Sequence, residues 1–341
     1  MDAGRAADLP APGPARGGLT ADAVPAADDI FVVVNPASGK GRGARLALPV
    51  VRALAEATGG ARVGHALSAH AGDEVALAQQ ALAQGYRRLV AVGGDGTWSN
   101  VGNAILRSGV DAALGLVAGG TGCDLAKSLD VPAQDVAAAA RVVAAGHTRT
   151  IDVGTVEGRY FLNIVGFGFD IAVIEDTWKV NYLRGAPLYL YCAVRQLYRF
   201  PGFPVEMAVD GRPGAREEML MLVIANARVF GGGFKVAPRA DLGDGQLDLV
   251  AFANMPRRRR FPLMVSLLRG THERAAEVRT ARAETFHLRF SGPPTYERDG
   301  EWSRAGSSEL EIGTRRAALR VLVPAPAVEM APASAPAPAP A

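Results

Sequence analysis

The chain has 341 residues, enough to bury a large core, and its length suggests two domains. Its 37 basic and 34 acidic residues leave a net charge of +3, which is too small to indicate nucleic-acid binding from the total alone. The two cysteines, Cys123 and Cys192, allow neither a disulfide framework nor a Cys/His metal motif, as is typical of a cytoplasmic protein. The longest apolar runs, such as 263–268, are far too short to span a bilayer, so membrane contact should be peripheral.

Both ends of the chain have the composition of disordered segments. Residues 1–27 are rich in Ala, Gly and Pro and lack the continuous apolar run of a secretory signal, so we expect a disordered leader. Residues 324–341 alternate Pro and Ala, which predicts an extended or disordered tail. The candidate functional residues therefore lie between them.

Three apolar strands in the first half each run into a glycine-rich turn and then a helix. They are 29–35 before Asn35-Pro-Ala-Ser-Gly-Lys-Gly-Arg-Gly43, 89–92 before Gly93-Gly-Asp-Gly-Thr97, and 113–117 before Ala118-Gly-Gly-Thr-Gly-Cys-Asp124. In a parallel sheet such turns project from the carboxyl edge, where open α/β sheets bind ligands. The pattern predicts one nucleotide site built from three loops.

The chemistry of these turns suits phosphate. Glycines allow positive φ and close backbone approach, so successive N–H groups and a helix N-terminus can face an anion. For the first turn alone, a solvated loop is an equally good interpretation, and the Gly93 turn beside it favours the phosphate site. Asp95 is unexpected there, because a carboxylate repels phosphate unless it holds a cation, a hydroxyl or backbone N–H groups.

Two common nucleotide motifs are absent from the sequence. The first turn does not match Gly-x-Gly-x-x-Gly, and no acidic residue ends the second strand to bind a ribose, which argues against a Rossmann dehydrogenase. No Gly-x-x-x-x-Gly-Lys-Ser/Thr pattern occurs either. Both absences favour a different nucleotide-binding fold.

Four motifs, in order, resemble those of the bacterial diacylglycerol kinase-like lipid kinases, which are related to sphingosine kinases and more distantly to NAD kinases and 6-phosphofructokinases. They are Val34-Asn-Pro-Ala-Ser-Gly-Lys40, Gly93-Gly-Asp-Gly-Thr97, Gly119-Gly-Thr-Gly-Cys-Asp-Leu-Ala126 and Asp299-Gly-Glu301. The resemblance covers about residues 30–323. It implies an α/β + β fold, with an N-terminal NAD kinase/6-phosphofructokinase-like nucleotide-binding domain (28–150) and a C-terminal lipid-binding β-sandwich (151–317). It also implies that a final strand near 318–323 returns to the first domain.

The second half supports the sandwich independently, because short β-branched or aromatic runs alternate with turn residues from Thr150 onward. One of these runs ends at Gly166-Phe-Gly-Phe-Asp170, which should add glycines to the interdomain cleft. For Asp170, a helix cap is about twice as probable as a catalytic role.

The resemblance implies ATP-dependent phosphorylation of a lipid hydroxyl, in the simplest case diacylglycerol to phosphatidic acid, with ATP and Mg²⁺ as cofactors. Glu301 matches the proton acceptor, Asp299 beside it is an alternate base, and Asp95 belongs to the metal and water network. The nucleotide-binding positions implied by the motifs are Asn35, Pro36, Ala37, Ser38, Gly39, Ser68, Gly93, Gly94, Asp95, Gly96, Thr97, Trp98, Ser99 and Thr121.

The segment Ala240-Asp-Leu-Gly-Asp-Gly-Gln-Leu-Asp248 places oxygen ligands in a turn, which suits a hard cation. A simple Asp-Gly hairpin accounts for the same sequence. By resemblance it holds a structural Mg²⁺ through the Asp244 side chain and the main-chain oxygens of Asp241 and Gln246. Three positions depart from the family pattern: Ser99-Asn100 replaces Asn-Glu, Cys123 replaces Asn, and Ser68 replaces Thr. A sphingoid base, a soluble acceptor and an inactive nucleotide- or lipid-binding module remain alternatives.

Two segments combine features expected at a lipid headgroup boundary. Residues 175–200 mix Trp and Tyr with Lys and Arg, and residues 255–282 contain eight Arg against two Glu beside an apolar run. A helix face over the core explains both segments, and for the first it is an equally good interpretation. We expect a cytoplasmic protein that binds anionic membranes peripherally and does not bind nucleic acid, and a homodimer is expected only by analogy.

Overall fold

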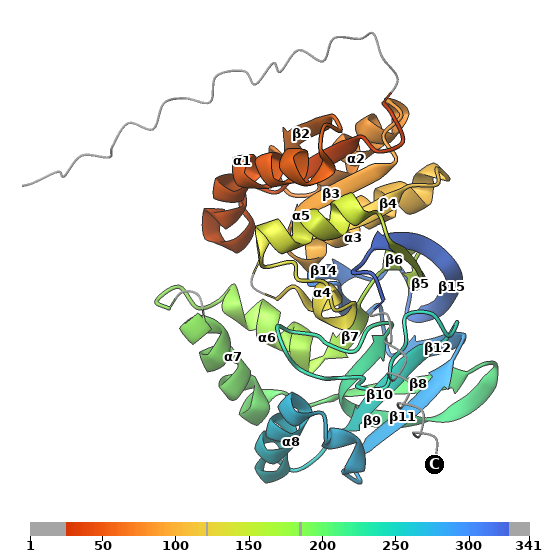
Figure 1. The fold of residues 1–341 in the computed structure, drawn as a ribbon. Coiled ribbons are helices and arrows are strands. Elements are labelled where there is room, and N and C mark those ends of the chain that lie inside the picture. Colours follow the sequence, from red (N-terminus) through yellow and green to blue (C-terminus); the bar gives the residue numbers. More distant parts are fainter. Residues whose placement is uncertain (1–24, 121, 184–185, 327–341) are drawn as a thin grey trace, which may run out of the picture.

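The computed structural model describes residues 25–120, 122–183 and 186–326 (Figure 1). Most of the expected leader and tail, and Thr121, lie outside the described residues. The helices are α1 (Ser38–Thr58), α2 (Asp73–Ala83), α3 (Asp95–Ser108), α4 (Asp124–Ser128), α5 (Val136–Ala145), α6 (Phe169–Thr177), α7 (Ala186–Arg199) and α8 (Arg257–Arg269), with a 3₁₀ turn η1 (His272–Arg274). The strands are β1 (Ile30–Val34), β2 (Val63–Leu67), β3 (Arg88–Gly93), β4 (Ala113–Ala118), β5 (Thr148–Val156), β6 (Arg159–Phe161), β7 (Ile164–Gly168), β8 (Phe203–Val209), β9 (Arg212–Ala225), β10 (Leu247–Ala253), β11 (Val278–Ala283), β12 (Thr285–Phe290), β13 (Thr295–Arg298), β14 (Glu301–Arg304) and β15 (Glu309–Leu322).

The N-terminal part is a parallel sheet in the order β2-β1-β3-β4, covered by helices on both faces (Figure 1). Alternate residues of β1 explain this layering: Ile30, Val32 and Val34 pack with α1 and α5, whereas Phe31 and Val33 pack with α2 and α3. A strand buried on both faces needs a continuous apolar sequence, as β1 has. The sheet's carboxyl edge thus carries the three glycine-rich turns.

The C-terminal part is mainly antiparallel, with β9 pairing β7, β8 and β10. In β9, Leu222 and Ile224 face a core enclosed by the strands, while Met221 and Val223 face a second core covered by α6, α7 and α8. The predicted fold class, an α/β domain followed by a β-rich domain, is confirmed. In the described ranges, none of the helices has the length and apolar composition needed to cross a bilayer.

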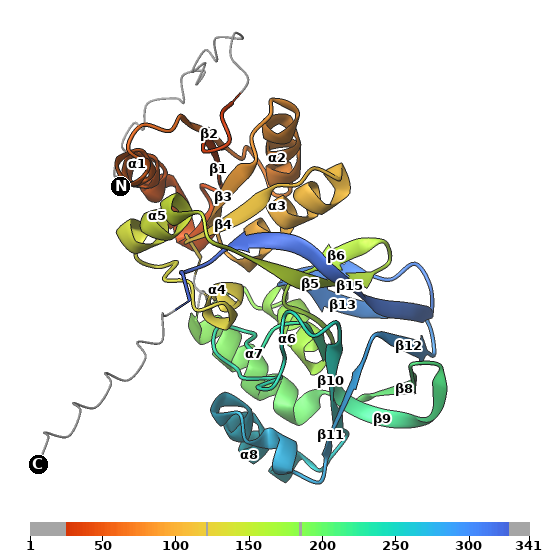
Figure 2. The ribbon, with the colours of Figure 1, turned by 45° about the vertical axis from the view of Figure 1, so that its right-hand side comes forward.

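The last strand connects the two parts. β15 pairs β12 in antiparallel fashion near its start and β4 in parallel fashion near its end, at Arg320 and Val321 (Figure 2). Strand β5 pairs with it from Ile312 to Leu322, with a register shift where Asp152 accepts the Ala317 N–H at 2.6 Å. This irregularity lets one pair of strands serve both sheets. It places the glycine turns of the first sheet against the β7 and β13 ends of the second.

Candidate active site

The three glycine turns meet at the carboxyl ends of β1, β3 and β4. The N–H groups of Gly119 and Gly120 donate to the Gly93 carbonyl at 2.7 and 3.1 Å, which joins the second and third turns. Gly39 has φ +57°, and a Cβ there would lie 2.0 Å from the Gly119 oxygen. The first and third turns can therefore approach each other only with glycine at position 39.

Side chains connect the first turn to the second. Asn35 Oδ1 accepts the N–H groups of Ala37 and Ser38 at 3.0 and 3.2 Å, and Asn35 Nδ2 donates to Thr97 Oγ1 at 3.1 Å. Asn35 thus shapes the first turn with one atom and holds it to α3 with another. Pro36 and Ala37 belong to this turn.

The turns border a polar cleft of about 380 Å³, which we call the glycine-loop cleft. Of the predicted site residues, those that line it are Asn35, Ser38, Gly39, Gly94, Asp95, Gly96, Thr97, Asp299 and Glu301. The lining residues that the prediction omitted are Ala71, Gly72, Glu74, Asn100, Gly120, Gly122 and Gly300. The structure therefore brings the phosphate-type turns and the candidate catalytic carboxylates to one opening.

The other predicted nucleotide residues support this cleft from behind. Trp98 is fully buried and its ring N–H donates to the Ala91 carbonyl at 3.1 Å, so its side chain is part of the core. Ser99 is buried and its carbonyl accepts the Asn103 amide, and buried Ser68 donates to Glu74 Oε1 at 3.2 Å. These buried positions favour a supporting role for the three side chains over direct contact with a nucleotide.

The contacts of Asp95 explain why a carboxylate stands in a glycine-rich turn. Its Oδ1 accepts the N–H groups of Asp124 and Leu125, at 2.8 and 3.1 Å, and the Asn163 amide at 3.0 Å. Burial raises the pKa of Asp95, as do the nearby carboxylates of Asp124 and Asp299, while the Leu125 and Asn163 hydrogen bonds oppose the rise. Asp95 therefore ties the third turn and the second domain to the start of α3.

Asp299 is a buried carboxylate that caps backbone groups. Its Oδ2 accepts the Leu162 N–H at 2.8 Å, and its Oδ1 accepts the N–H groups of Asn163 and Ile164 at 2.8 and 3.1 Å. Only 3% of the residue is exposed. With both oxygens engaged by the segment before β7, Asp299 is placed to hold the site's shape.

Glu301 has a different environment. Asp299 and Gly300 both have positive φ and form the two-residue turn between β13 and β14, so Glu301 begins the next strand. Its Oε2 accepts from Arg298 at 3.0 Å and its Oε1 from Asn100 at 3.4 Å, and 40% of its side chain is exposed. Of the two carboxylates in this turn, Glu301 is the one open to a substrate.

A second cleft of about 390 Å³, which we call the Tyr189 cleft, adjoins the first. Both clefts are lined by Asp95, Gly122, Asp299 and Gly300. The remaining lining of the Tyr189 cleft is Asp124, Asn163, Ile164, Ile174, Tyr189, Phe230, Gly231, Gly232 and Glu297. A polar cleft and a largely apolar one thus share a wall that carries two carboxylates, Asp95 and Asp299.

The loop assigned to a structural Mg²⁺ has its carboxylates already paired. Asp241 Oδ1 lies 2.6 Å from an Arg149 nitrogen, and the Asp244 carboxylate pairs with Arg282 while also accepting the Gln246 N–H. In the ranges that the structure describes, no group of three or more His, Cys, Asp or Glu side chains is arranged to hold a metal. The Asp244 carboxylate is thus engaged by Arg282 in this structure, and a Mg²⁺ site built from Asp244 and the main-chain oxygens of Asp241 and Gln246 stays a prediction.

Two structural residues escaped prediction because their roles depend on distant contacts. Asn163 links Asp95 to the second domain, and Arg298, whose side chain is 4% exposed, bonds both Glu301 and the Tyr160 carbonyl. The sequence indicated Asn100 only as a departure from the family motif, without a contact or a role. At Cys123, burial raises the pKa of the thiol to about 12, so this substitution leaves an uncharged group in the third turn.

The fold and site define a two-domain protein in which a polar, glycine-walled cleft adjoins a largely apolar one. The model of the Diacylglycerol kinase catalytic domain matches residues 29–156, and that of the YegS C-terminal NAD kinase beta sandwich-like domain matches 163–323. A Mycobacterium tuberculosis (strain ATCC 25618 / H37Rv) protein named diacylglycerol kinase is 30% identical over 300 residues, covering 86% of this chain and 95% of the relative. The chain therefore belongs to the diacylglycerol kinase-like family of lipid kinases, which confirms the resemblance.

Other relatives agree with this assignment. A Bacillus subtilis (strain 168) diacylglycerol kinase is 31% identical over 279 residues, covering 80% of this chain and 89% of the relative. A probable lipid kinase YegS-like protein of Pseudomonas aeruginosa (strain ATCC 15692 / PAO1) is 35% identical over 184 residues, covering 52% and 58%. A crystal structure of a putative diacylglycerol kinase from Bacillus anthracis str. Sterne has a TM-score of 0.73 at 22% identity, covering 87% of this chain and 95% of that one, and supports the fold.

Proposed function

We propose that this lipid kinase transfers the γ-phosphoryl group of ATP to the hydroxyl of diacylglycerol, giving phosphatidic acid. The observation that carries the proposal is the shared wall: Asp95 and Asp299 line both the glycine-loop cleft and the Tyr189 cleft, and Glu301 follows directly after that wall. Phosphoryl transfer needs a donor and an acceptor placed in line, and two adjoining clefts provide those places.

In this mechanism the glycine-loop cleft holds the phosphates through backbone N–H groups and the start of α3. Mg²⁺ enters with ATP as part of the donor and neutralises phosphate charge. The lipid hydroxyl attacks the γ-phosphorus, the bond to the bridging oxygen of ADP breaks, and Glu301 accepts the hydroxyl proton. Arg298 and Asn100 orient the Glu301 carboxylate through the hydrogen bonds described above.

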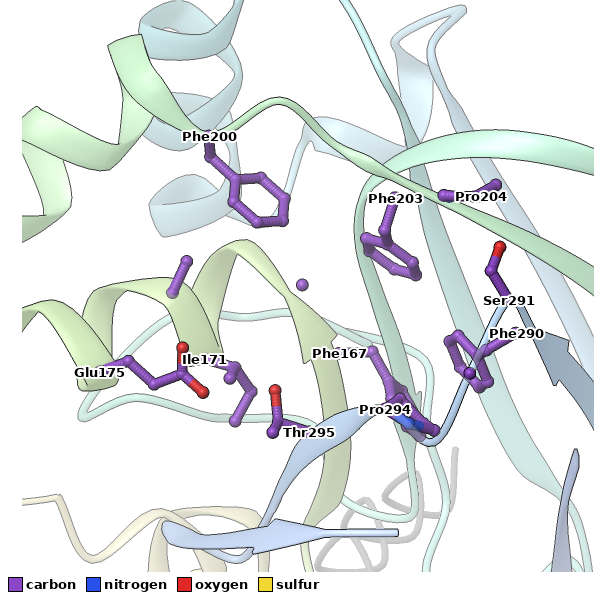
Figure 3. Close-up of a pocket in the computed structure, with 13 residues that line it drawn as sticks. Phe167, Ile171, Glu175, Phe200, Phe203, Pro204, Phe290, Ser291, Pro294 and Thr295 are labelled. Carbon is purple, nitrogen blue, oxygen red and sulfur yellow. The ribbon is translucent and has the colours of Figure 1, made fainter. Parts of the chain in front are cut away.

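An apolar pocket of about 280 Å³ near the Tyr189 cleft suits an acyl chain (Figure 3). Four phenylalanine rings line it, with the Phe167 and Phe290 centroids 5.2 Å apart and the Phe203 and Phe290 centroids 6.1 Å apart. Ile171 of α6 closes another side. An aromatic and aliphatic lining of this kind favours a hydrocarbon ligand over a soluble polar acceptor.

The test incubates the purified protein with radiolabelled ATP and vesicles that contain diacylglycerol, a long-chain amino alcohol or no acceptor. Labelled phosphatidic acid is expected, and the Asp95→Asn variant should form much less of it. Preferred labelling of the amino alcohol or of a soluble acceptor would contradict the diacylglycerol assignment. Nucleotide binding without any labelled product would indicate an inactive binding module.

We further propose that α7, α8 and the tryptophans beside Glu301 form the membrane-docking surface. The exposed large apolar residues there are Trp178, Tyr182, Tyr189, Leu190, Tyr191, Val194, Tyr198, Phe261, Leu268 and Trp302. The Trp178 and Trp302 rings lie 5.5 Å apart, edge to face, so this surface begins at the residue next to Glu301. Arg257, Arg258 and Arg259 are exposed at the start of α8 and add positive charge. Helix α8 itself contacts α7 (Figure 1). Aromatic residues beside cations favour an anionic lipid surface.

Arg260 belongs to the same basic run but has a structural role. It is 5% exposed and donates to the carbonyls of Leu197, Phe200 and Met255, which ties α8 to the end of α7. The basic run therefore supplies three exposed arginines and one buried one. A variant meant to weaken docking should leave Arg260 intact.

Reversing two charges, as Arg257→Glu with Arg258→Glu, is expected to weaken binding to anionic vesicles by more than 10-fold, because each basic residue near an anionic surface contributes about 1 kcal/mol. Cosedimentation with phosphatidylcholine vesicles, with and without phosphatidylserine, measures this. The control is Arg141→Glu, an exposed residue of α5, which packs against α1 in the N-terminal part. Equal loss in the control, or unchanged binding of the double variant, would contradict the proposed surface.

A further inference from the structure

Two buried carboxyl groups, Asp170 and Glu297, lie beside the Tyr189 cleft and have no assigned role. Asp170 is 4% exposed, and among the described residues no side chain donates a hydrogen bond to either of its oxygens. Glu297 is 3% exposed, and its Oε1 also lacks a partner there. Buried polar groups are nearly always hydrogen-bonded, and a proton shared between the two acids can satisfy Asp170, whereas Glu297 also lines the Tyr189 cleft and can reach a ligand there.

The helix-cap interpretation of Asp170 is wrong. Gly168 occupies the N-cap position of α6, and no side chain caps this helix. Instead, Asp170 and Glu297 converge over Gly166: a Cβ at position 166 would lie 2.0 Å from Asp170 Oδ2 and 3.2 Å from Glu297 Cγ. Glycine at 166 therefore leaves the space that the two acids occupy.

The pair lies between the Tyr189 cleft and the apolar pocket. Along α6, Ile174 lines the cleft and Ile171 lines the pocket, and Asp170 of the same helix lies over Gly166 of β7. Along β13, Glu297 lines the cleft and Thr295, two residues away on the same face of the strand, lines the pocket. If the lipid hydroxyl lies in the cleft and an acyl chain lies in the pocket, the polar glycerol and ester groups of the lipid would lie next to the pair.

The environment favours the neutral form of Glu297 and, less strongly, that of Asp170. Burial raises the pKa of Asp170 to about 7, while the backbone N–H groups of Ile171 and of Asp170 itself, at the start of α6, oppose the rise. Burial also raises the pKa of Glu297 well above its usual value, and the carboxylates of Asp170, Asp299 and Asp124 raise it further. From α7, Tyr189 lines the same cleft: burial of its phenol end and both acids raise its pKa, while 45% of the residue as a whole is exposed. A neutral carboxyl differs from a carboxylate in carrying an O–H donor.

We propose that the protonated Glu297 carboxyl donates a hydrogen bond to an ester carbonyl of the acceptor lipid, with Asp170 positioned to keep it neutral, so that the pair selects acylglycerols. This assignment rests on the proposed function of the site, and it names the part of the acceptor that the second domain recognises. Glu297 is a specificity-determining residue and Asp170 a positioning residue, and neither takes part in the proton transfer from the hydroxyl.

The experiment compares a short-chain diacylglycerol with its dialkyl ether analogue, which has the same hydroxyl but no ester carbonyl. The wild type is expected to prefer the ester, and Glu297→Met should reduce the ester-to-ether ratio of kcat/KM by about 5- to 10-fold, since one hydrogen bond is lost. Glu297→Gln keeps an N–H donor of the same size and should keep the ratio within about 2-fold. A merely structural role would lower both substrates alike and leave the ratio unchanged.

Equilibrium binding of the same two lipids by titration calorimetry, without ATP, separates the two proposals. Preferential ester binding that Glu297→Met removes supports the inference, even where no labelled lipid forms and the kinase proposal fails. Equal binding of ester and ether by the wild type overturns it, whatever the kinase activity. Tighter binding of a long-chain amino alcohol that Glu297→Gln abolishes also overturns it, because the pair would then be acting as a carboxylate for an ammonium group.

Discussion

Replacing Glu301 by Gln is expected to slow lipid phosphorylation by about 10²- to 10⁴-fold, the usual contribution of a positioned general base. The amide keeps the size of the side chain but cannot accept the hydroxyl proton. Asn100 and Arg298 would still contact the amide oxygen in part, and the glycine turns are untouched. We therefore expect unchanged melting temperature and nucleotide affinity, measured by thermal unfolding and by fluorescent-nucleotide titration beside the radiolabel assay.

The matched control is Glu309→Gln, in an exposed glutamate at the start of β15 that pairs only with the exposed Arg289. This variant should retain wild-type activity. Substantial activity in Glu301→Gln would show that another group accepts the proton. Loss of nucleotide affinity together with activity would instead place Glu301 in the binding of the donor.

The α/β + β fold could be predicted because its signals are local. The β1, β3 and β4 sequences are continuous apolar runs, each followed by a glycine turn, and the second half changes to short strands. The loop cluster followed from the rule that such turns share one edge of a parallel sheet. By contrast, the course of β15 through both sheets depends on pairings with β12, β5 and β4 that no local pattern specifies.

The roles within the site could be predicted only in part. The sequence places Asp299 and Glu301 two residues apart, but the difference between them depends on the Leu162–Ile164 backbone, far away in the chain. The Asp170 and Glu297 pair is likewise created by two separate elements meeting over Gly166. Motifs report residue identity and spacing, whereas the hydrogen-bond partners that decide a carboxylate's role are tertiary contacts.

Asn100 shows what one departure from the family pattern changes physically. Its amide nitrogen lies 3.4 Å from Glu74 Oε2 and 3.4 Å from Glu301 Oε1. A glutamate at this position would bring a third carboxylate to the same place and repel both neighbours. With asparagine the group becomes a donor that orients Glu301, and the repulsion is absent.

A substitution at Asp299 tests whether this residue is structural while Glu301 accepts the proton. Removing the Asp299 charge should reduce the stability of the fold more than it affects the chemical step. Its two oxygens accept three buried backbone N–H groups, from Leu162, Asn163 and Ile164. In Asp299→Asn one oxygen becomes an NH₂ group that faces an N–H donor, so at least one buried donor loses its partner. Such a loss costs about 1–3 kcal/mol, and it is partly offset because burial, which raises the pKa of Asp299, no longer acts on a charge.

We therefore expect Asp299→Asn to lower the free energy of unfolding by about 1–3 kcal/mol, seen as a fall in melting temperature and in soluble yield. Asp241→Asn is the control: that carboxylate is exposed and paired with Arg149, and an exposed ion pair contributes less than about 1 kcal/mol. The comparison with Glu301→Gln separates the two roles: Asp299→Asn should lose stability, whereas Glu301→Gln should lose turnover. An Asp299→Asn protein with wild-type stability and no activity would assign the proton acceptor to Asp299 instead.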